Sequence, residues 1–148
     1  MAPGCRPESS VNAQTPAELA ALVARARDAL PHAHAPYSDF QVAAAVLDDA
    51  GRVHVGVNVE NASYGLTMCA ERVAIGTAIA AGAKRILAVG VTSRQLHPIS
   101  PCGACRQVIR EFADADAPVA SDTPDGSLVV TTAGELLPGP FLSLDPAS

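Results

Sequence analysis

The chain has 148 residues, of which 49% are hydrophobic and 17% charged, a balance that predicts one globular domain with a packed core and excludes a disordered chain. The formal net charge of −5, with ten Lys and Arg residues in all, argues against a DNA- or RNA-binding surface. No apolar run is long enough to cross a bilayer, and the first ten residues lack the apolar stretch of a secretory signal, so we expect a cytoplasmic protein.

A loose tail followed by a helix is expected at the N-terminus. Residues 1–14 are rich in Pro, Ser and Gly without periodicity, which predicts a flexible tail. The stretch 15–30 begins with helix-start chemistry, because Thr15 can act as the N-cap, Pro16 suits the first helical position and Glu18 completes a capping box. Five apolar residues fall on one face of this helix and predict packing onto a core: Leu19, Leu22, Val23, Ala26 and Leu30.

Two strands around a tight turn are expected next. Residues 40–47 are predicted as the first strand, DDAG as the turn and residues 53–59 as the second strand. Valine occupies every odd position from 53 to 59. This alternation predicts that one face of the second strand is buried.

The middle of the chain alternates helix, strand and helix. Residues 67–82 predict a mostly buried helix that is closed by Gly82. Residues 85–92 predict a short buried strand, and residues 100–113 predict a third helix.

Two further strands and a short helix complete the predicted fold. The strands are expected at 117–121 and 127–132, around the turn TPDG, and the pattern T-A-G-E at 132–135 is a second capping box. The order α-β-β-α-β-α-β-β predicts an α/β fold with three layers (α/β/α), in which helices cover both faces of a mixed five-stranded sheet. We expect residues 15–148 to form a single domain without internal repeats.

Three of the four cysteines lie where two predicted helices begin. Cys102 and Cys105 form a C-x-x-C pair, which alone is compatible with a disulfide, a redox pair or half of a metal site. Cys69, at the start of the other helix, supplies a third thiol. A helix N-terminus carries partial positive charge and free N–H groups, which stabilise a thiolate. Three thiolates would leave a tetrahedral Zn²⁺ one open position, as catalytic zinc sites do.

Glu71 lies two residues after Cys69 and points to a reactive metal site. A carboxylate beside the open position of the ion can move protons between water and a substrate nitrogen. C-A-E followed by P-C-x-x-C is the three-cysteine form of the zinc deaminase signature. Three thiolates and Zn²⁺ sum to −1. We therefore expect Arg72 to donate to a cysteine sulfur and, with two helix dipoles, to offset this charge.

Other interpretations of the cysteines remain open at this point. A thioredoxin-like redox pair would use Cys102 and Cys105 alone and has no need of Glu71. A structural zinc would need a fourth protein ligand, and Cys5 or His97 could serve, although neither has motif spacing. Buried, inert cysteines could explain any one of the three but not their pattern.

The remaining histidines are expected at the surface or in loops: His32, His34 and His54.

Four stretches occur in the order typical of one family and together span nearly all of residues 31–142: PYSDFQVAAAV, GVNVENASYGLTMCAERVAI, SPCGACRQVIREF and ELLPGPF. With them the chain resembles the homotetrameric, three-cysteine type of cytidine deaminase. The resemblance implies the cytidine deaminase-like fold, one Zn²⁺ per subunit and a homotetramer with sites at its subunit interfaces. The chain departs from the family in its longer tail and in Ala43, where the family usually has glycine.

The resemblance also implies roles for individual residues. Asn58 and Glu60 would bind the ribose 3′-hydroxyl, and as alternate strand residues they would point to one face. Phe40 would pack on the pyrimidine ring, with a plain core role as the alternative, and the backbone of Ala70 and Cys102 would contact the base. Three residues would reach a neighbouring subunit's site, although the last could simply cover the core: Ala62, Tyr64 and Phe141.

The implied activity is hydrolytic deamination of cytidine and 2′-deoxycytidine to the uridines with release of ammonia, a step of pyrimidine salvage catalysed by Glu71. A deaminase of a modified cytosine nucleoside, such as blasticidin S, is the runner-up, and NVEN favours an ordinary ribose over it. The low basic content argues against an RNA- or DNA-editing deaminase. A zinc-stabilised binding module would give no reason for Glu71, Asn58 and Glu60 to occur together. We expect a small nucleoside as the partner, with neither nucleic acid nor membrane.

Overall fold

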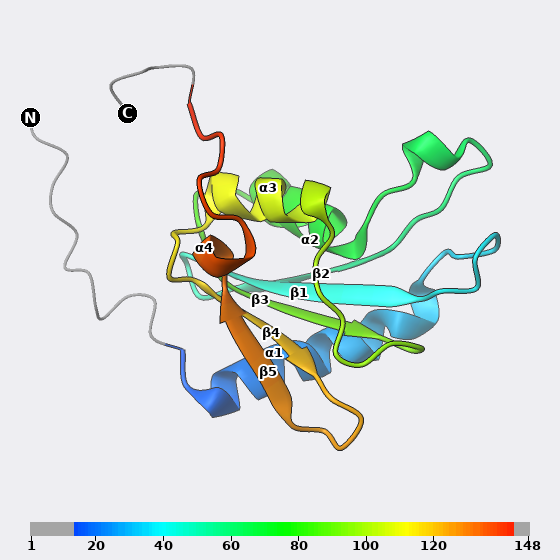
Figure 1. Cartoon of the computed structure of the whole chain (residues 1–148), viewed down its shortest axis with the longest axis horizontal. Helices are drawn as coiled ribbons and strands as arrows, with labels where there is room; N and C mark the ends of the chain where they lie inside the picture. Colours follow the sequence, from blue (N-terminus) through cyan, green and yellow to red (C-terminus); the bar gives the residue numbers. More distant parts are fainter. Residues whose placement is uncertain (1–13, 144–148) are drawn as a thin grey trace, which may run out of the picture.

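The computed structural model describes residues 14–143 and places a mixed five-stranded sheet between two layers of helices (Figure 1). The strand order is β2-β1-β3-β4-β5. β1 runs antiparallel to β2 and β3, β3 and β4 are parallel, and β5 is antiparallel to β4. The predicted α/β fold is confirmed. The strands are β1 (Val42–Asp48), β2 (Val53–Val57), β3 (Ile86–Ser93), β4 (Pro118–Asp122) and β5 (Leu128–Thr132).

One helix covers one face of the sheet, and the other helices cover the opposite face (Figure 1). The helices are α1 (Pro16–Ala29) on the first face and α2 (Ala70–Ala80), α3 (Gly103–Phe112) and α4 (Ala133–Leu136) on the second, with short 3₁₀ turns η1 (Leu30–His32) and η2 (Tyr64–Leu66). The helix α3 crosses over between β3 and β4, which is why these two strands can run parallel. Among the described residues, no helix is both long and apolar enough to span a bilayer.

Both predicted capping boxes are present. Thr15 Oγ1 accepts from the Glu18 amide at 3.1 Å, and Glu18 Oε2 accepts from the Thr15 amide at 3.0 Å. Thr132 and Glu135 form the same reciprocal pair at the start of α4. The five apolar residues predicted on one face of the first helix are all buried against the sheet. The predicted tail, which includes Cys5, lies outside the described residues except for Gln14.

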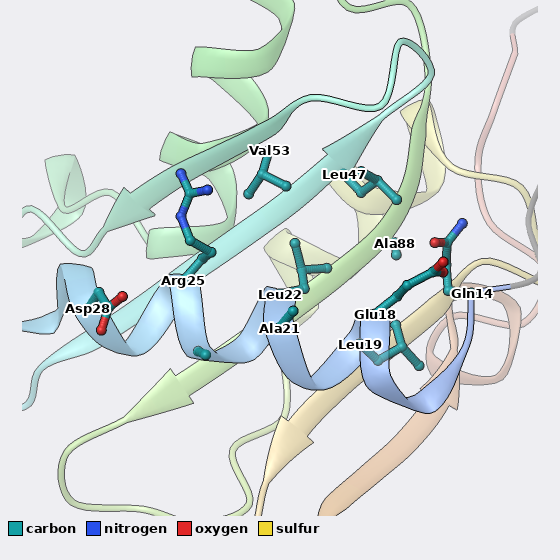
Figure 2. A pocket seen from close by; sticks show the side chains of 11 residues that line it. Gln14, Glu18, Leu19, Ala21, Leu22, Arg25, Asp28, Leu47, Val53 and Ala88 are labelled. Carbon is teal, nitrogen blue, oxygen red and sulfur yellow. The ribbon is translucent and has the colours of Figure 1, made fainter.

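The prediction that the valine face of β2 is buried is wrong for two of its four valines. Val55 and Val59 are 36% and 41% exposed, whereas Val53 and Val57 pack at the margin of the α1 cluster. The reason is that α1 packs mainly on β1 and β3 and covers the valine face of β2 only in part. A groove lined by Leu47 and Val53 runs beside the helix (Figure 2). β2 also ends at Val57 rather than at residue 59.

The opposite face of β2 is the buried one. Gly56 is buried beneath α2, and a Cβ built on it would lie 2.4 Å from the amide nitrogen of Ala74 and 2.6 Å from the carbonyl oxygen of Ala70. Only glycine allows this close approach of strand and helix. The contact sets the position of α2, whose first turn carries functional residues.

Asp48 is a buried carboxylate that the sequence analysis did not single out. Its Oδ1 accepts from the amides of Ala50 and Arg52 at 2.8 and 2.9 Å, and its Oδ2 accepts from Arg52 Nε at 2.9 Å and pairs with His54 Nε2 at 2.8 Å. This network closes the turn between β1 and β2. The His54 side chain is only 10% exposed, so the expectation of a surface or loop histidine is wrong for this residue.

Candidate metal centre and active site

The three predicted cysteine ligands meet between α2 and α3. Cys69 is the N-cap of α2, Cys102 is the N-cap of α3, and Cys105 lies in the first turn of α3. Their sulfur atoms all lie within 4.8 Å of one another, with Sγ–Sγ distances of 3.7 Å for Cys69–Cys102 and 3.5 Å for Cys102–Cys105. All three are free thiols, so the C-x-x-C pair is not a disulfide.

The geometry of this donor set fits zinc. Tetrahedral zinc with Zn–S bonds of about 2.3 Å separates its sulfur ligands by about 3.8 Å, close to the distances observed here. Within residues 14–143, the cluster consists of these three cysteines. His97, the described candidate for a fourth ligand, instead places Nδ1 3.3 Å from Asp122 Oδ1. Three protein ligands and an open position are typical of a catalytic zinc site.

Arg72 places positive charge beside the sulfur of Cys69. Arg72 Nη2 lies 3.6 Å from Cys69 Sγ and donates to the Thr67 carbonyl at 3.3 Å. Hydrogen bonds from Cys105 and then Arg72 lower the pKa of Cys69 to about 5, although burial acts in the opposite direction. The hydrogen bond with Cys69, together with burial beside Glu71, raises the pKa of the Cys105 thiol. A bound cation would displace this proton, because zinc binds thiolates.

Glu71 is the buried carboxylate of the site. It lies in the first turn of α2, is 4% exposed and accepts a hydrogen bond from Cys105 Sγ to its Oε2 at 3.3 Å. Burial raises the pKa of the Glu71 carboxyl above its ordinary range, and the hydrogen bonds from its own amide and from Cys105 only partly oppose this shift. A carboxyl with a raised pKa takes up a proton more readily than an ordinary carboxyl and can release it again.

A pocket of about 230 Å³ opens onto Glu71, Cys69 and Cys102. Its walls include Phe40, Asn58 and Ala70. A second pocket of about 250 Å³ is lined by Tyr37, Ser38, Glu60, Tyr64 and Thr67, and Thr67 also lines the first pocket. The fold thus brings most of the predicted substrate residues, which come from distant parts of the chain, into two adjoining hollows.

Asn58 and Glu60 are already engaged with the backbone of the segment before β1. Asn58 Oδ1 accepts from the Val42 amide at 3.0 Å, and its Nδ2 donates to the Phe40 carbonyl at 2.7 Å. One N–H of Asn58 and one lone pair of its amide oxygen remain for a ligand.

Glu60 is fixed in the same way by its neighbours. Its Oε1 accepts from the amides of Tyr37 and Ser38 at 2.9 and 3.1 Å, and the Ser38 hydroxyl donates to Oε2. The Ser38 hydroxyl bond lowers the pKa of Glu60, and the two amides add to this effect, so the group is an ionised acceptor. Tyr37 and Ser38 were not predicted, since no periodicity or spacing in the sequence marks them as partners of Glu60.

The three residues predicted to reach another subunit are absent from the lining of the pocket beside Glu71. Ala62 and Tyr64 belong to a segment that projects from the body between β2 and α2, drawn in green in Figure 1. Tyr64 is 73% exposed, and its ring makes an edge contact with Tyr37, with the centroids 5.7 Å apart. Phe141 is 65% exposed, and its carbonyl accepts from Gln107 Nε2 at 2.6 Å.

Comparison with known proteins agrees with this site. A family model described as "Cytidine and deoxycytidylate deaminase zinc-binding region" matches residues 16–121. The chain is 45% identical over 124 residues to a cytidine deaminase of Halalkalibacterium halodurans, covering 84% of this chain and 94% of that one. It is 39% identical to a cytidine deaminase of Mycobacterium tuberculosis over 120 residues, or 81% and 86% of the two chains.

Solved structures show the same fold. A crystal structure of cytidine deaminase from Burkholderia pseudomallei superimposes with a TM-score of 0.77 at 46% identity, covering 82% of this chain and 97% of that one. A crystal structure of cytidine deaminase from Mycobacterium leprae gives a TM-score of 0.70 at 40% identity over 80% and 95% of the chains. With its cysteine cluster and matching fold, this chain belongs to the cytidine and deoxycytidylate deaminase family of zinc-binding proteins.

Proposed function

We propose that this protein catalyses the zinc-dependent hydrolytic deamination of cytidine and 2′-deoxycytidine to uridine and 2′-deoxyuridine, with release of ammonia. The observation that carries the proposal is the buried Glu71 carboxylate, 3.3 Å from Cys105 Sγ at the wall of the pocket. The named relatives, which are cytidine deaminases, support the choice of substrate.

The cysteine thiolates of this chain would hold one Zn²⁺. When bound, the ion supplies Lewis-acid activation that makes water a nucleophile at neutral pH. Arg72 and the N-termini of α2 and α3 offset the negative charge of three thiolates.

Glu71 would carry protons during the reaction. Its carboxylate takes one proton from the attacking water and passes it to N3 of the cytosine ring. It then takes the second proton from the hydroxyl newly bonded to C4 and delivers it to the amino group, which leaves as ammonia. The carboxylate's raised pKa suits these transfers, because it brings the proton affinity of the group closer to that of its partners.

The remaining pocket residues would orient the nucleoside. Phe40 would pack on the pyrimidine ring, the backbone of Ala70 and Cys102 would contact the base, and Asn58 and Glu60 would bind the ribose 3′-hydroxyl. Phe40 and Asn58 line the hollow beside Glu71 and Glu60 lines the adjoining one, which supports a substrate that extends across both hollows. Such contacts contribute by positioning the substrate.

Glu71→Gln tests the proposal directly. The variant should retain one zinc per chain and lose activity by about a thousandfold, because the amide cannot accept the proton. Glu111→Gln, at an exposed position of α3, is the matched control and should keep wild-type turnover. Glu71→Gln activity at a tenth of wild type or more contradicts the proposal.

A panel of substrates distinguishes the proposed activity from deamination of chemically related compounds. Cytidine, 2′-deoxycytidine, free cytosine and blasticidin S can be compared by the change in ultraviolet absorbance. We expect turnover of the two nucleosides to exceed that of the other compounds. Preferential turnover of blasticidin S would assign the protein to the modified substrate instead.

The assembly expected from the family resemblance is a homotetramer with sites completed at subunit interfaces. Tyr64, Leu66 and Phe141 are 73%, 65% and 65% exposed, and their availability for contact with another subunit supports this proposal. Light scattering coupled to size exclusion should give four times the chain mass of 15.1 kDa.

A reducing cytoplasm is the expected compartment, because three free thiols must stay reduced to hold the ion.

A further inference from the structure

The backbone before β1 is held in a conformation that ordinary residues avoid. Asp39 has φ of 55°, in the left-handed region, although it is not a glycine. It directly precedes Phe40, which lines the pocket beside Glu71. This region is less favourable than the usual conformations, although Asp tolerates it better than most residues, so surrounding contacts help to hold the chain there, and such positions are often found at functional sites.

Two exposed or partly exposed glutamines supply these contacts. Gln95 Nε2 donates to Gln41 Oε1 at 2.8 Å and to the Asp39 carbonyl, and its Oε1 accepts from the Gln41 amide at 3.2 Å. Gln41 Nε2 in turn donates to Asp39 Oδ1 at 3.0 Å. We call this set of bonds between Gln41, Gln95 and Asp39 the glutamine clamp. It binds the residues on both sides of Phe40 to the loop that follows β3.

The glutamine clamp continues the connection between β1 and β3 beyond the last backbone pairing of these two strands. Val42 of β1 pairs with Ser93 of β3 in the last register position, and the Arg94 amide donates to the Gln41 carbonyl at 3.1 Å. Beyond that point the side chains of Gln41 and Gln95 replace backbone pairing. Gln95 is exposed, so no packing requirement explains its three bonds to one short segment.

We propose that Gln95, acting with Gln41 through the glutamine clamp, is a positioning residue that holds Phe40 against the base-binding pocket. The inference rests on the proposed function, in which Phe40 packs on the pyrimidine ring. Without the clamp, the left-handed turn at Asp39 relaxes and the ring of Phe40 leaves its place. Because the ring contacts the base equally in the ground state and the transition state, its loss raises KM and leaves kcat unchanged.

Two variants of Gln95 and one neighbour test the proposal. Gln95→Ala removes every clamp bond made by this side chain, and Gln95→Glu keeps its size and its acceptor but loses both donors. Each should raise KM for cytidine by about fivefold, with kcat within about twofold of wild type and one zinc per chain. Arg94→Ala, at the adjacent exposed position, is the matched control and should leave KM unchanged.

A double variant shows whether the two glutamines act as one unit. Gln41→Ala combined with Gln95→Ala should raise KM by less than the product of the two single effects, because both changes remove the bond between Gln95 Nε2 and Gln41 Oε1. Effects on KM that multiply would overturn the proposal. So would a KM within about 1.5-fold of wild type in both Gln95 variants, or a loss of kcat without a change in KM.

Amide hydrogen exchange separates failure of the clamp from failure of the proposed activity. Exchange of residues 36–42 should be faster in Gln95→Ala than in wild type or in Arg94→Ala, whatever the substrate. If the wild-type protein does not deaminate cytidine, the proposed function fails, and this measurement still decides whether the clamp holds the segment. Unchanged exchange at 36–42 refutes the clamp.

Discussion

At the scale of single residues, buried hydrogen bonds set the ionisation of Asp48. Asp48 is fully buried and accepts four hydrogen bonds, from Ala50, Arg52 and His54. Burial alone would raise the pKa of its carboxyl, but the bond with His54 and the amides of Arg52 and Ala50 prevail and lower it to about 2. The ionised carboxylate is therefore part of the folded state, and the turn between β1 and β2 depends on it.

Asp48→Asn should destabilise the fold by about 3 kcal/mol near pH 6, because it removes the charge that satisfies Arg52 and His54. The folded pKa of Asp48 lies below its usual value of 3.8, so this stabilisation is present above pH 3.8 and is lost as the pH falls towards about 2. The difference in unfolding free energy between wild type and variant should therefore shrink over that range. Asp28→Asn, at an exposed position of α1, is the control. A difference independent of pH would contradict this assignment.

At the scale of elements, the active site depends on how closely α2 lies against β2. The approach is set by Gly56, over which the backbone of Ala70 and Ala74 passes. The same helix begins with Cys69 as its N-cap and Glu71 in its first turn. A displacement of α2 therefore moves a predicted zinc ligand and the predicted proton carrier together.

Gly56→Ala should lower both stability and zinc affinity. The added Cβ would lie 2.4 Å from a backbone nitrogen, which cannot move as a side chain would, and overpacking of this kind costs about 3 kcal/mol. Unfolding in urea and zinc titration would measure the two effects. Gly76→Ala in α2 is the matched control, since its Cβ meets nothing within 4 Å, and it should be neutral or stabilising. Equal behaviour of the two variants would refute the close-packing account.

At the scale of the whole molecule, the metal cluster joins the starts of two helices. Cys69 belongs to α2 and Cys102 to α3, and these helices lie side by side on one face of the sheet (Figure 1). An ion bound by both helices binds the folded state alone and so stabilises the complete domain. The segment between β2 and α2 projects from this core (Figure 1), and Tyr64 in that segment and Phe141 near the C-terminus are both largely exposed.

Removal of zinc should lower the thermal midpoint of unfolding. At a thousandfold excess of free zinc over its Kd, the ion stabilises the fold by about 4 kcal/mol, and a chelator would remove this contribution. Cys69→Ser should resemble the chelated protein and respond little to chelator, whereas Cys5→Ser should respond as wild type does. If Cys5→Ser lost zinc, a fourth cysteine ligand would have to be assigned. Differential scanning fluorimetry with parallel metal analysis provides the readout.

The sequence predicted the structure best where a short local pattern is compatible with only one local structure. Both capping boxes, the apolar face of α1 and the order of strands and helices follow from spacing over a few residues, and the structure confirms each of them. The cysteine cluster was also predictable, because Cys69 and the pair Cys102 and Cys105 mark two helix starts in a known signature. The roles assigned to Phe40, Asn58, Glu60 and the interface residues remain predictions.

Local sequence by itself determined the elements, their caps and the metal-binding residue types, since these depend on neighbours one or two turns away. Only the tertiary structure decided which face of β2 is buried, because that depends on where α1 and α2 lie across the sheet. The same holds for the burial of Asp48 and for the pairing of Gln41 with Gln95, 54 positions later in the chain. Contacts between elements that are remote in sequence leave no periodic signal, and they appear only when the layers pack.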